Sequence, residues 1–236
     1  MRLKFVIGGS GVFAMKRTED LGVSDLKIYQ DDALYTFTSD AIMLAKFARV
    51  KPKDTVADLC AGCGVVGFYL YGLSPEKISS VTFFEMQKPL FDLINENIER
   101  NALKDKFTAY NLKVQDIPKS MYGKFSLIVC NPPYMSVGAG EKDASEEIAV
   151  CRREICLSLD ELIAAIAKGL KFGGRVCIVH RSDRLIDVVC GMREKGIEPK
   201  RIVPVAPFGK EPYLVLIEGV KGGKSGLKLG ATAFNR

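Results

Sequence analysis

Short apolar runs alternate with helical patterns along most of the chain. This alternation predicts parallel strands joined by crossover helices, which return the chain to the same edge of a sheet. Strands are expected over residues 55–60, 80–85, 107–112, 125–130, 175–180, 202–205 and 213–217. Helices are expected over residues 67–73, 88–101, 158–170 and 184–195.

The last two expected strands are connected differently from the others. Residues 207–212 separate them, which is too short a segment for a crossover helix, so the two strands should pair as an antiparallel hairpin. The predicted fold is therefore α/β: a doubly wound, Rossmann-like sheet of seven mostly parallel strands with an antiparallel C-terminal hairpin. We assign residues 37–219 to this domain, residues 1–36 to an N-terminal extension and residues 220–236 to a basic tail rich in glycine and lysine.

Composition indicates a globular protein. A chain of 236 residues with 47% hydrophobic residues can bury a sizeable core. No apolar run approaches the roughly 20 residues that span a bilayer, so we expect neither a membrane anchor nor a secretory signal. The seven cysteines are odd in number and irregularly spaced, which argues against a disulfide framework. We therefore predict a cytoplasmic protein.

Positive charge gathers towards the C-terminus. The net charge is +6, and residues 195–236 carry six lysines and two arginines against three glutamates. This pattern is typical of proteins with anionic partners, and also of an ordinary solvated basic surface. Both interpretations stay open. Under the first, Lys221, Lys224 and Lys228 are candidate contacts to RNA phosphates.

A glycine-rich loop follows the first strand of the expected domain. Its glycines at 62, 64 and 67 spell G-x-G-x-x-G between a strand and a helix, and Glu85 ends the next strand. The spacing fits a dinucleotide site, where such glycines admit a pyrophosphate. Asp58 instead favours a ligand with positive charge. S-adenosylmethionine has an ammonium and a sulfonium, and also a ribose that Glu85 can bind.

Cys60 and Cys63 form a C-x-x-C pair inside the same loop. No second pair with zinc-ribbon spacing follows, and His180 is the only histidine in the sequence. A tetrahedral metal site would need four such ligands. We therefore predict no metal.

The strand at 125–130 ends in Asn131, Pro132, Pro133 and Tyr134. Proline lacks a backbone N–H and constrains the residue before it, so the chain must leave the sheet here as a stiff loop. In doubly wound sheets, ligands bind beyond the carboxyl ends of the strands. The residues expected to converge on one crevice are Asp58, Glu85, Asp116 and Asn131.

From about residue 34 to 217 the chain resembles the class I S-adenosylmethionine-dependent methyltransferases, with DLCAGCG as the cofactor loop and NPPY as the amino-methylating motif. Within that class it is most similar to the bacterial tRNA adenine-N6 methyltransferases that modify the adenine beside the anticodon of a valine tRNA. The similar stretches include TFTSDAIMLAKFA, FFEMQ and KEPYLVLIEGVKGGKSGLK. Two positions depart from the family pattern. Cys60-Ala61 stands where glycine with another small residue is usual, and Arg153 where histidine is expected.

The resemblance implies S-adenosylmethionine as cofactor and the anticodon loop of a tRNA as partner. Asn131 and the Pro132 carbonyl would accept hydrogen bonds from the target amine, Pro133 would stiffen the loop, and Tyr134 would stack on the base. Asp58, the loop and Glu85 would hold the methionine part and the ribose, and Asp116 with Ile117 the adenine. The implied cofactor contacts are Phe37, Thr38, Asp40, Asp58, Cys60, Ala61, Gly62, Gly64, Glu85, Met86, Asp116, Ile117 and Asn131.

Other substrates and other classes of function stay open on the sequence. An exocyclic amine also occurs on guanine N2 of ribosomal RNA, on adenine N6 of DNA and on a glutamine side chain. A nicotinamide-dependent oxidoreductase would explain the glycine spacing, and a non-catalytic RNA-binding module would explain the charge. Neither of these two explains NPPY.

Overall fold

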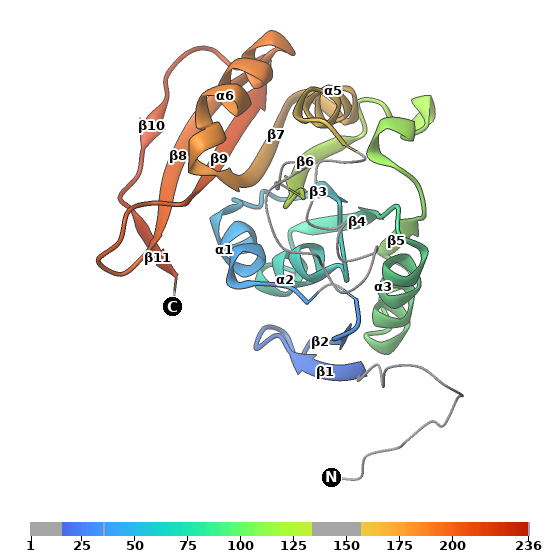
Figure 1. Ribbon diagram of the computed structural model, residues 1–236. Helices are drawn as coiled ribbons and strands as arrows, with labels where there is room; N and C mark the ends of the chain where they lie inside the picture. Colours follow the sequence, from blue (N-terminus) through green and yellow to red (C-terminus); the bar gives the residue numbers. More distant parts are fainter. Residues whose placement is uncertain (1–15, 35, 134–156, 236) are drawn as a thin grey trace.

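The computed structural model describes residues 16–34, 36–133 and 157–235. A nine-stranded sheet forms its centre, in the order β10-β8-β9-β7-β6-β3-β4-β5, with β11 also paired to β8 (Figure 1). The run from β7 to β5 is parallel, and β9 is antiparallel to both β7 and β8. The principal strands are β3 (Asp54–Leu59), β4 (Ile78–Phe84), β5 (Phe107–Tyr110), β6 (Phe125–Cys130), β7 (Leu170–Arg181), β8 (Ile197–Pro207) and β9 (Leu214–Lys221).

This architecture confirms the predicted doubly wound α/β fold and its antiparallel C-terminal hairpin. Helices cover both faces of the sheet, with α5 and α6 on one face and α1 and α2 on the other (Figure 1). Their bounds are α1 (Ser39–Phe47), α2 (Val65–Leu73), α3 (Lys88–Arg100), α5 (Leu159–Gly169) and α6 (Leu185–Glu194). Short 3-10 turns lie at η1 (Val114–Asp116), η2 (Lys119–Met121) and η3 (Ser182–Arg184).

The described part of the expected N-terminal extension is a hairpin of β1 (Lys16–Asp20) and β2 (Lys27–Asp31) that packs on α3. Asn97 of α3 is fully buried and bonds to β2 twice: its Oδ1 accepts from Tyr29 N at 2.6 Å and its Nδ2 donates to Tyr29 O at 3.2 Å. Ile28 is buried in the same apolar cluster as α1 and α2. This segment therefore shares its core with the domain, and the boundary at residue 37 stays a prediction.

The expected tail contributes two short strands. The strands β10 (Lys228–Leu229) and β11 (Ala233–Asn235) pair in parallel with β8 and extend the sheet beyond the seven predicted strands. Strands of two or three residues are too short to show a period of two in the sequence. Backbone pairing along the exposed edge of β8 forms them instead.

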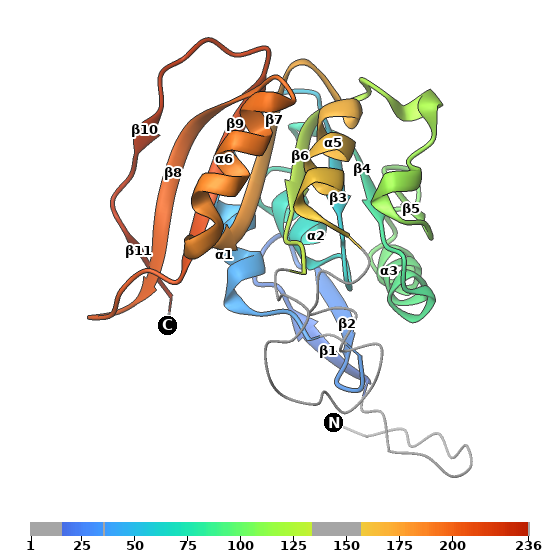
Figure 2. The same ribbon diagram turned by 45° about the horizontal axis from the view of Figure 1, so that its top comes forward.

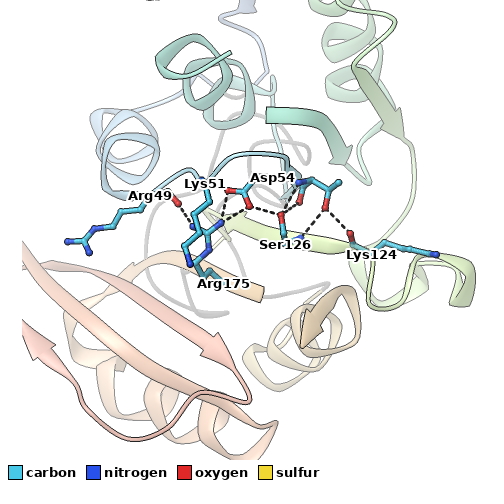
Figure 3. A network of polar contacts seen from close by, with 7 residues as sticks. Arg49, Lys51, Asp54, Lys124, Ser126 and Arg175 are labelled. Carbon is cyan, nitrogen blue, oxygen red and sulfur yellow. Dashed lines mark hydrogen bonds and ion pairs between the residues drawn. The ribbon is translucent and has the colours of Figure 1, made fainter. Parts of the chain in front are cut away.

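A buried polar network ties the amino ends of β3 and β6 to the middle of β7 (Figure 3). Nη2 of Arg175 donates to both carboxylate oxygens of Asp54, at 2.7 and 2.6 Å. Ser126 Oγ donates to Asp54 Oδ1 at 2.7 Å and accepts from Thr55 N at 2.9 Å. The charged pair thus has several partners, which a buried ion pair needs to offset its desolvation.

Replacing Ser126 with alanine should lower the free energy of unfolding by about 1–3 kcal/mol, because the Thr55 N–H loses its acceptor and Asp54 loses a donor. Urea denaturation followed by circular dichroism measures the change. Ser79→Ala, at an exposed position of β4, is the matched control and should change stability by less than about 0.5 kcal/mol. Equal stability of the two variants would show that the hydrogen bonds of Ser126 contribute little to the free energy of unfolding.

Among the described residues, no helix is long and apolar enough to cross a membrane.

Candidate active site

Three parallel strands end at the same level of the sheet. Leu59 of β3 pairs with Phe84 of β4 on one side and with Cys130 of β6 on the other. The glycine loop after β3, Glu85 after β4 and Asn131 after β6 therefore lie along one edge. The strand order reverses at β3, since the chain continues to β4 on one side and later to β6 on the other. A switch point of this kind is where doubly wound sheets bind ligands.

The loop after β3 has a left-handed backbone at three positions, Cys60 (φ 57°), Gly62 (φ 57°) and Gly64 (φ 85°). Glycine adopts this conformation without cost, whereas a residue with a Cβ is strained by roughly 1–2 kcal/mol. Cys60 is thus strained at a position where the resemblance described above leads us to expect glycine. Gly67 serves a different purpose: a Cβ there would lie 2.5 Å from the Phe83 ring, so glycine lets α2 pack closely on β4.

Glu85 holds this loop through one carboxylate oxygen and bonds to the turn after β4 through the other. Its Oε2 accepts from Gly62 N and its Oε1 from Gln87 N, each at 2.9 Å. Asn111, which follows β5, donates through Nδ2 to the carbonyls of Glu85 and Met86 at 3.0 and 2.9 Å. Burial raises the pKa of Glu85 to about 7, although the backbone N–H groups favour its charged form.

Asp58 is fully buried beneath the loop. Its Oδ2 accepts from Gly67 N at 2.9 Å, whereas its Oδ1 has no hydrogen-bond partner within the described part of the chain. Burial raises the pKa of Asp58 well above its usual range, the Gly67 bond lowers it in part, and the charge of Glu85 raises it further. An orphaned carboxylate oxygen beside a second carboxylate suits a cationic group and repels a pyrophosphate.

The catalytic candidates follow β6 directly. Asn131 is half-buried, Pro132 is buried and Pro133 is half-buried. All three lie next to the loop of β3, because β3 and β6 pair up to Leu59 and Cys130. Tyr134 lies outside the described residues, so its predicted stacking role stays a prediction.

The predicted cofactor contacts near the N-terminus lie at the start of α1, at Phe37, Thr38 and Asp40. Thr38 Oγ1 donates to Asp40 Oδ2 at 3.1 Å, and the Tyr213 hydroxyl donates to Asp40 Oδ1 at 3.4 Å. Phe37 N donates to Gln30 Oε1 at 3.2 Å. Asp40 thereby connects the start of α1 to the start of β9, a link that the sequence did not predict.

Asp116 and Ile117 lie farther beyond the end of β5 than expected. The strand β5 ends at Tyr110, and Asp116 is exposed in η1, which packs against α5. Ile117 is buried in the apolar cluster that includes Ala57 and Phe84. Their contact with the cofactor's adenine stays a prediction.

Of the three candidate lysines, Lys221 lies away from this edge. Lys221 Nζ donates to the carbonyls of Ala167 and Leu170 at 2.5 and 2.8 Å, at the C-terminal end of α5. Val220 of β9 pairs with Arg175 of β7, which in turn pairs with Leu127 near the amino end of β6. Lys221 follows Val220 and therefore lies towards the amino ends of the parallel strands, opposite to Asn131. Lys224 and Lys228 are exposed. Their contact with phosphates stays a prediction.

The C-x-x-C pair is part of the loop's packing. Cys63 is almost completely buried, burial raises the pKa of its thiol to about 12, and its carbonyl accepts from Asn97 Nδ2 at 3.2 Å. Within the described ranges, no group of three or more His, Cys, Asp or Glu side chains is placed to hold a metal ion. That the protein binds no metal therefore stays a prediction.

Burial lowers the pKa of His180 to about 4, so its imidazole is neutral at pH 7.

Sequence reasoning missed Asn97, Asn111 and Tyr213. Asn111 could have been found, because it directly follows a parallel strand, as Glu85 does. Asn97 gives no such signal: it lies within a helix, and its partners Tyr29 and Cys63 are distant in sequence.

The sheet order, the glycine loop after β3 and the Asn-Pro-Pro segment after β6 together define the class I methyltransferase fold. Two solved structures are similar in fold. A crystal structure of a predicted O-methyltransferase from Agrobacterium tumefaciens has a TM-score of 0.65 at 18% identity and covers 83% of this chain and 86% of that chain. The structure of P. horikoshii TYW2 in complex with MeSAdo has a TM-score of 0.60 at 18% identity and covers 89% of this chain and 72% of that chain.

The chain belongs to the methyltransferase small domain family, whose model matches residues 38–188. A relative from Histophilus somni (strain 2336), named tRNA1(Val) (adenine(37)-N6)-methyltransferase, is 24% identical over 207 residues, which are 86% of this chain and 84% of the relative. These matches confirm the predicted methyltransferase family.

Proposed function

We propose that this protein transfers a methyl group from S-adenosylmethionine to the exocyclic N6 amine of an adenine in tRNA, beside the anticodon of a valine tRNA. The observation that carries the proposal is the position of Asn131 and Pro132, which lie at the switch point beside the glycine loop. The name of the Histophilus somni relative supports tRNA adenine as the substrate. The described cysteines are free thiols, which fits the cytoplasm, where tRNA is processed.

The cofactor assignment rests on Asp58 and Glu85. When bound, S-adenosylmethionine supplies an electrophilic methyl group. The unpartnered Oδ1 of Asp58 suits its ammonium, and the Glu85 carboxylate suits its ribose hydroxyls. We propose that Phe37, Thr38 and Asp40 close the site from the start of α1, and that Met86, Asp116 and Ile117 hold the adenine ring.

Asn131 and Pro132 would act on the target amine. The lone pair of an amine on a purine is delocalised into the ring, so the amine is a poor nucleophile. Two hydrogen-bond acceptors at the amine favour the geometry in which its lone pair is available. As the nitrogen gains positive charge its protons become better donors, so these bonds strengthen in the transition state. Two consecutive prolines hold both acceptors in place. Tyr134 would stack on the base.

Cofactor affinity should rise with pH through about 7. The Glu85 carboxyl is neutral below its pKa of about 7 and ionised above it, and the ribose hydroxyls bond more strongly to the carboxylate. One coupled proton gives at most a tenfold change in affinity per pH unit. Calorimetric titration with S-adenosylmethionine between pH 6 and 8 measures the profile. Glu85→Gln should remove the part of the profile that depends on this carboxyl, and an identical profile in the variant would contradict the assignment.

We propose that Lys224 and Lys228 contact phosphates of the tRNA body, with Lys221 as a third, weaker candidate because its ammonium bonds to the end of α5. Changing Lys224 and Lys228 together to alanine should weaken tRNA binding and lower the salt slope by about one for each phosphate that a lysine neutralises. Changing the exposed Lys104 and Lys119 instead is the matched control. Equal slopes for the two double variants would identify the tail as an ordinary solvated surface.

Methyl transfer from labelled cofactor to separate samples of tRNA, ribosomal RNA and DNA tests the proposed substrate class. We expect label in tRNA, and none when tRNA is replaced by DNA. A parallel titration with NADH addresses the oxidoreductase alternative. Saturable binding of NADH without binding of S-adenosylmethionine would overturn the methyltransferase proposal.

A further inference from the structure

An exposed pair of phenylalanines lies at the carboxyl edge of the sheet, beyond the end of β8. Phe208, in the turn between β8 and β9, is 86% exposed, and Phe234 of β11 is 54% exposed. Their ring centroids are 5.5 Å apart with an interplanar angle of 59°. Largely exposed aromatic rings cost hydration free energy, and two of them in contact form an apolar patch that can serve as an interaction site.

The pair lies at the same edge of the sheet as Asn131. Both β7 and β8 run antiparallel to β9, so β8 ends at the edge where β6 and β7 end. Figure 2 shows the turn after β8, the C-terminus and the end of β6 all towards the lower side of the molecule. Three strand spacings, about 14 Å, separate β8 from β6 across the sheet. Ile202 is level with Cys130, so Phe208 also lies six residues, about 20 Å, farther along the strand direction. The rings can therefore contact a nucleotide a few positions away from the target base on the same RNA strand.

A chain of hydrogen bonds connects the pair to the candidate site. Asn235, next to Phe234, donates through Nδ2 to the Tyr213 hydroxyl, and that hydroxyl donates to Asp40 Oδ1 at 3.4 Å. Asp40 in turn accepts from Thr38 at the start of α1. These bonds fix β11 to the domain, so the position of Phe234 is set by the same residues that border the site.

We infer that Phe208 and Phe234 form a stacking platform for an unpaired base of the RNA substrate, a few nucleotides from the base that is methylated. The inference rests on the proposed function. Unpaired bases stack on aromatic side chains regardless of sequence. A net charge of +6 also favours a nucleic acid as the occupant over a second copy of this chain, which carries the same charge.

The test compares Phe208→Ala and Phe234→Ala with Phe172→Ala. Phe172 is 81% exposed but lies near the start of β7, at the opposite edge of the sheet, so it is the matched control. Binding of a fluorescently labelled, unmodified tRNA transcript gives Kd, and methyl transfer gives KM and kcat. Both test variants should raise Kd and KM for tRNA at least about fivefold. The control, the cofactor affinity and kcat at saturating tRNA should change by less than about twofold.

Two further variants separate stacking from simple apolar contact. Phe208→Trp keeps an aromatic face and should bind tRNA as the unchanged protein does, whereas Phe208→Leu should resemble Phe208→Ala. Unchanged tRNA binding in Phe208→Ala, or full binding in Phe208→Leu, would overturn the platform. So would a dimer of the unchanged protein, measured by light scattering, that Phe208→Ala dissociates. Absence of methyl transfer together with Phe208-dependent tRNA binding would instead refute the proposed activity and leave the platform standing.

Discussion

Replacing Asn131 with alanine is expected to lower the rate of methyl transfer about 100- to 1,000-fold, the usual effect of removing one group that stabilises developing charge in a transition state. Asn131 directly follows the last residue of β6 and is half-buried, so loss of its side chain should leave the sheet intact. Single-turnover methyl transfer at saturating tRNA and cofactor measures the rate. Cofactor affinity should change little.

Two variants make this result specific. Asn131→Asp retains an oxygen acceptor at the same place and should keep more activity than Asn131→Ala. Asn95→Ala removes another half-buried asparagine, one that bonds to Phe91 within α3, and should have normal activity. A rate near normal in Asn131→Ala would mean that the Asn-Pro-Pro segment only turns the chain.

Replacing Asp58 with asparagine should weaken the binding of S-adenosylmethionine by about tenfold to 150-fold, as expected for loss of a hydrogen bond to a charged group of about 1.5–3 kcal/mol. The fold should tolerate the change. Asp58 is fully buried with one oxygen unpartnered among the described residues, so a neutral amide removes a desolvated charge. The melting temperature of the cofactor-free protein should therefore stay equal or rise.

Calorimetry and thermal denaturation separate the two effects of this substitution. Asp92→Asn, at an exposed position of α3, is the control and should change neither quantity. A variant with lower stability and unchanged cofactor affinity would give Asp58 a structural role, in which it only accepts the bond from Gly67.

The sequence predicted the central strands because each is a short apolar run that must be buried on both faces. The strand β6 matches its expected range, and β3, β4 and β5 differ by one or two residues at their ends. The polar residues after β3, β4 and β6 could be chosen for the same reason, since parallel strands share a carboxyl edge. Asp116 was chosen by the same rule, but β5 ends earlier, and Asn111 occupies the place that the rule assigns.

Other features depend on contacts that no local pattern encodes. The β1–β2 hairpin is held by Asn97 of α3 and by Asn101, which follows α3, about seventy residues away. The strand β11 pairs with the end of β8 over three residues and so brings Phe234 to Phe208. Lys221 looks like part of a basic tail in the sequence, yet its ammonium bonds to the end of α5. Partners so far apart in sequence become visible only in the folded chain.

Nucleoside analysis by mass spectrometry after methyl transfer to an unmodified valine tRNA transcript tests the central claim most directly. The account predicts that the added methyl group appears as N6-methyladenosine, and that a transcript with guanosine in place of the adenosine beside the anticodon accepts none. Label in another nucleoside, or equal methylation of both transcripts, would contradict it.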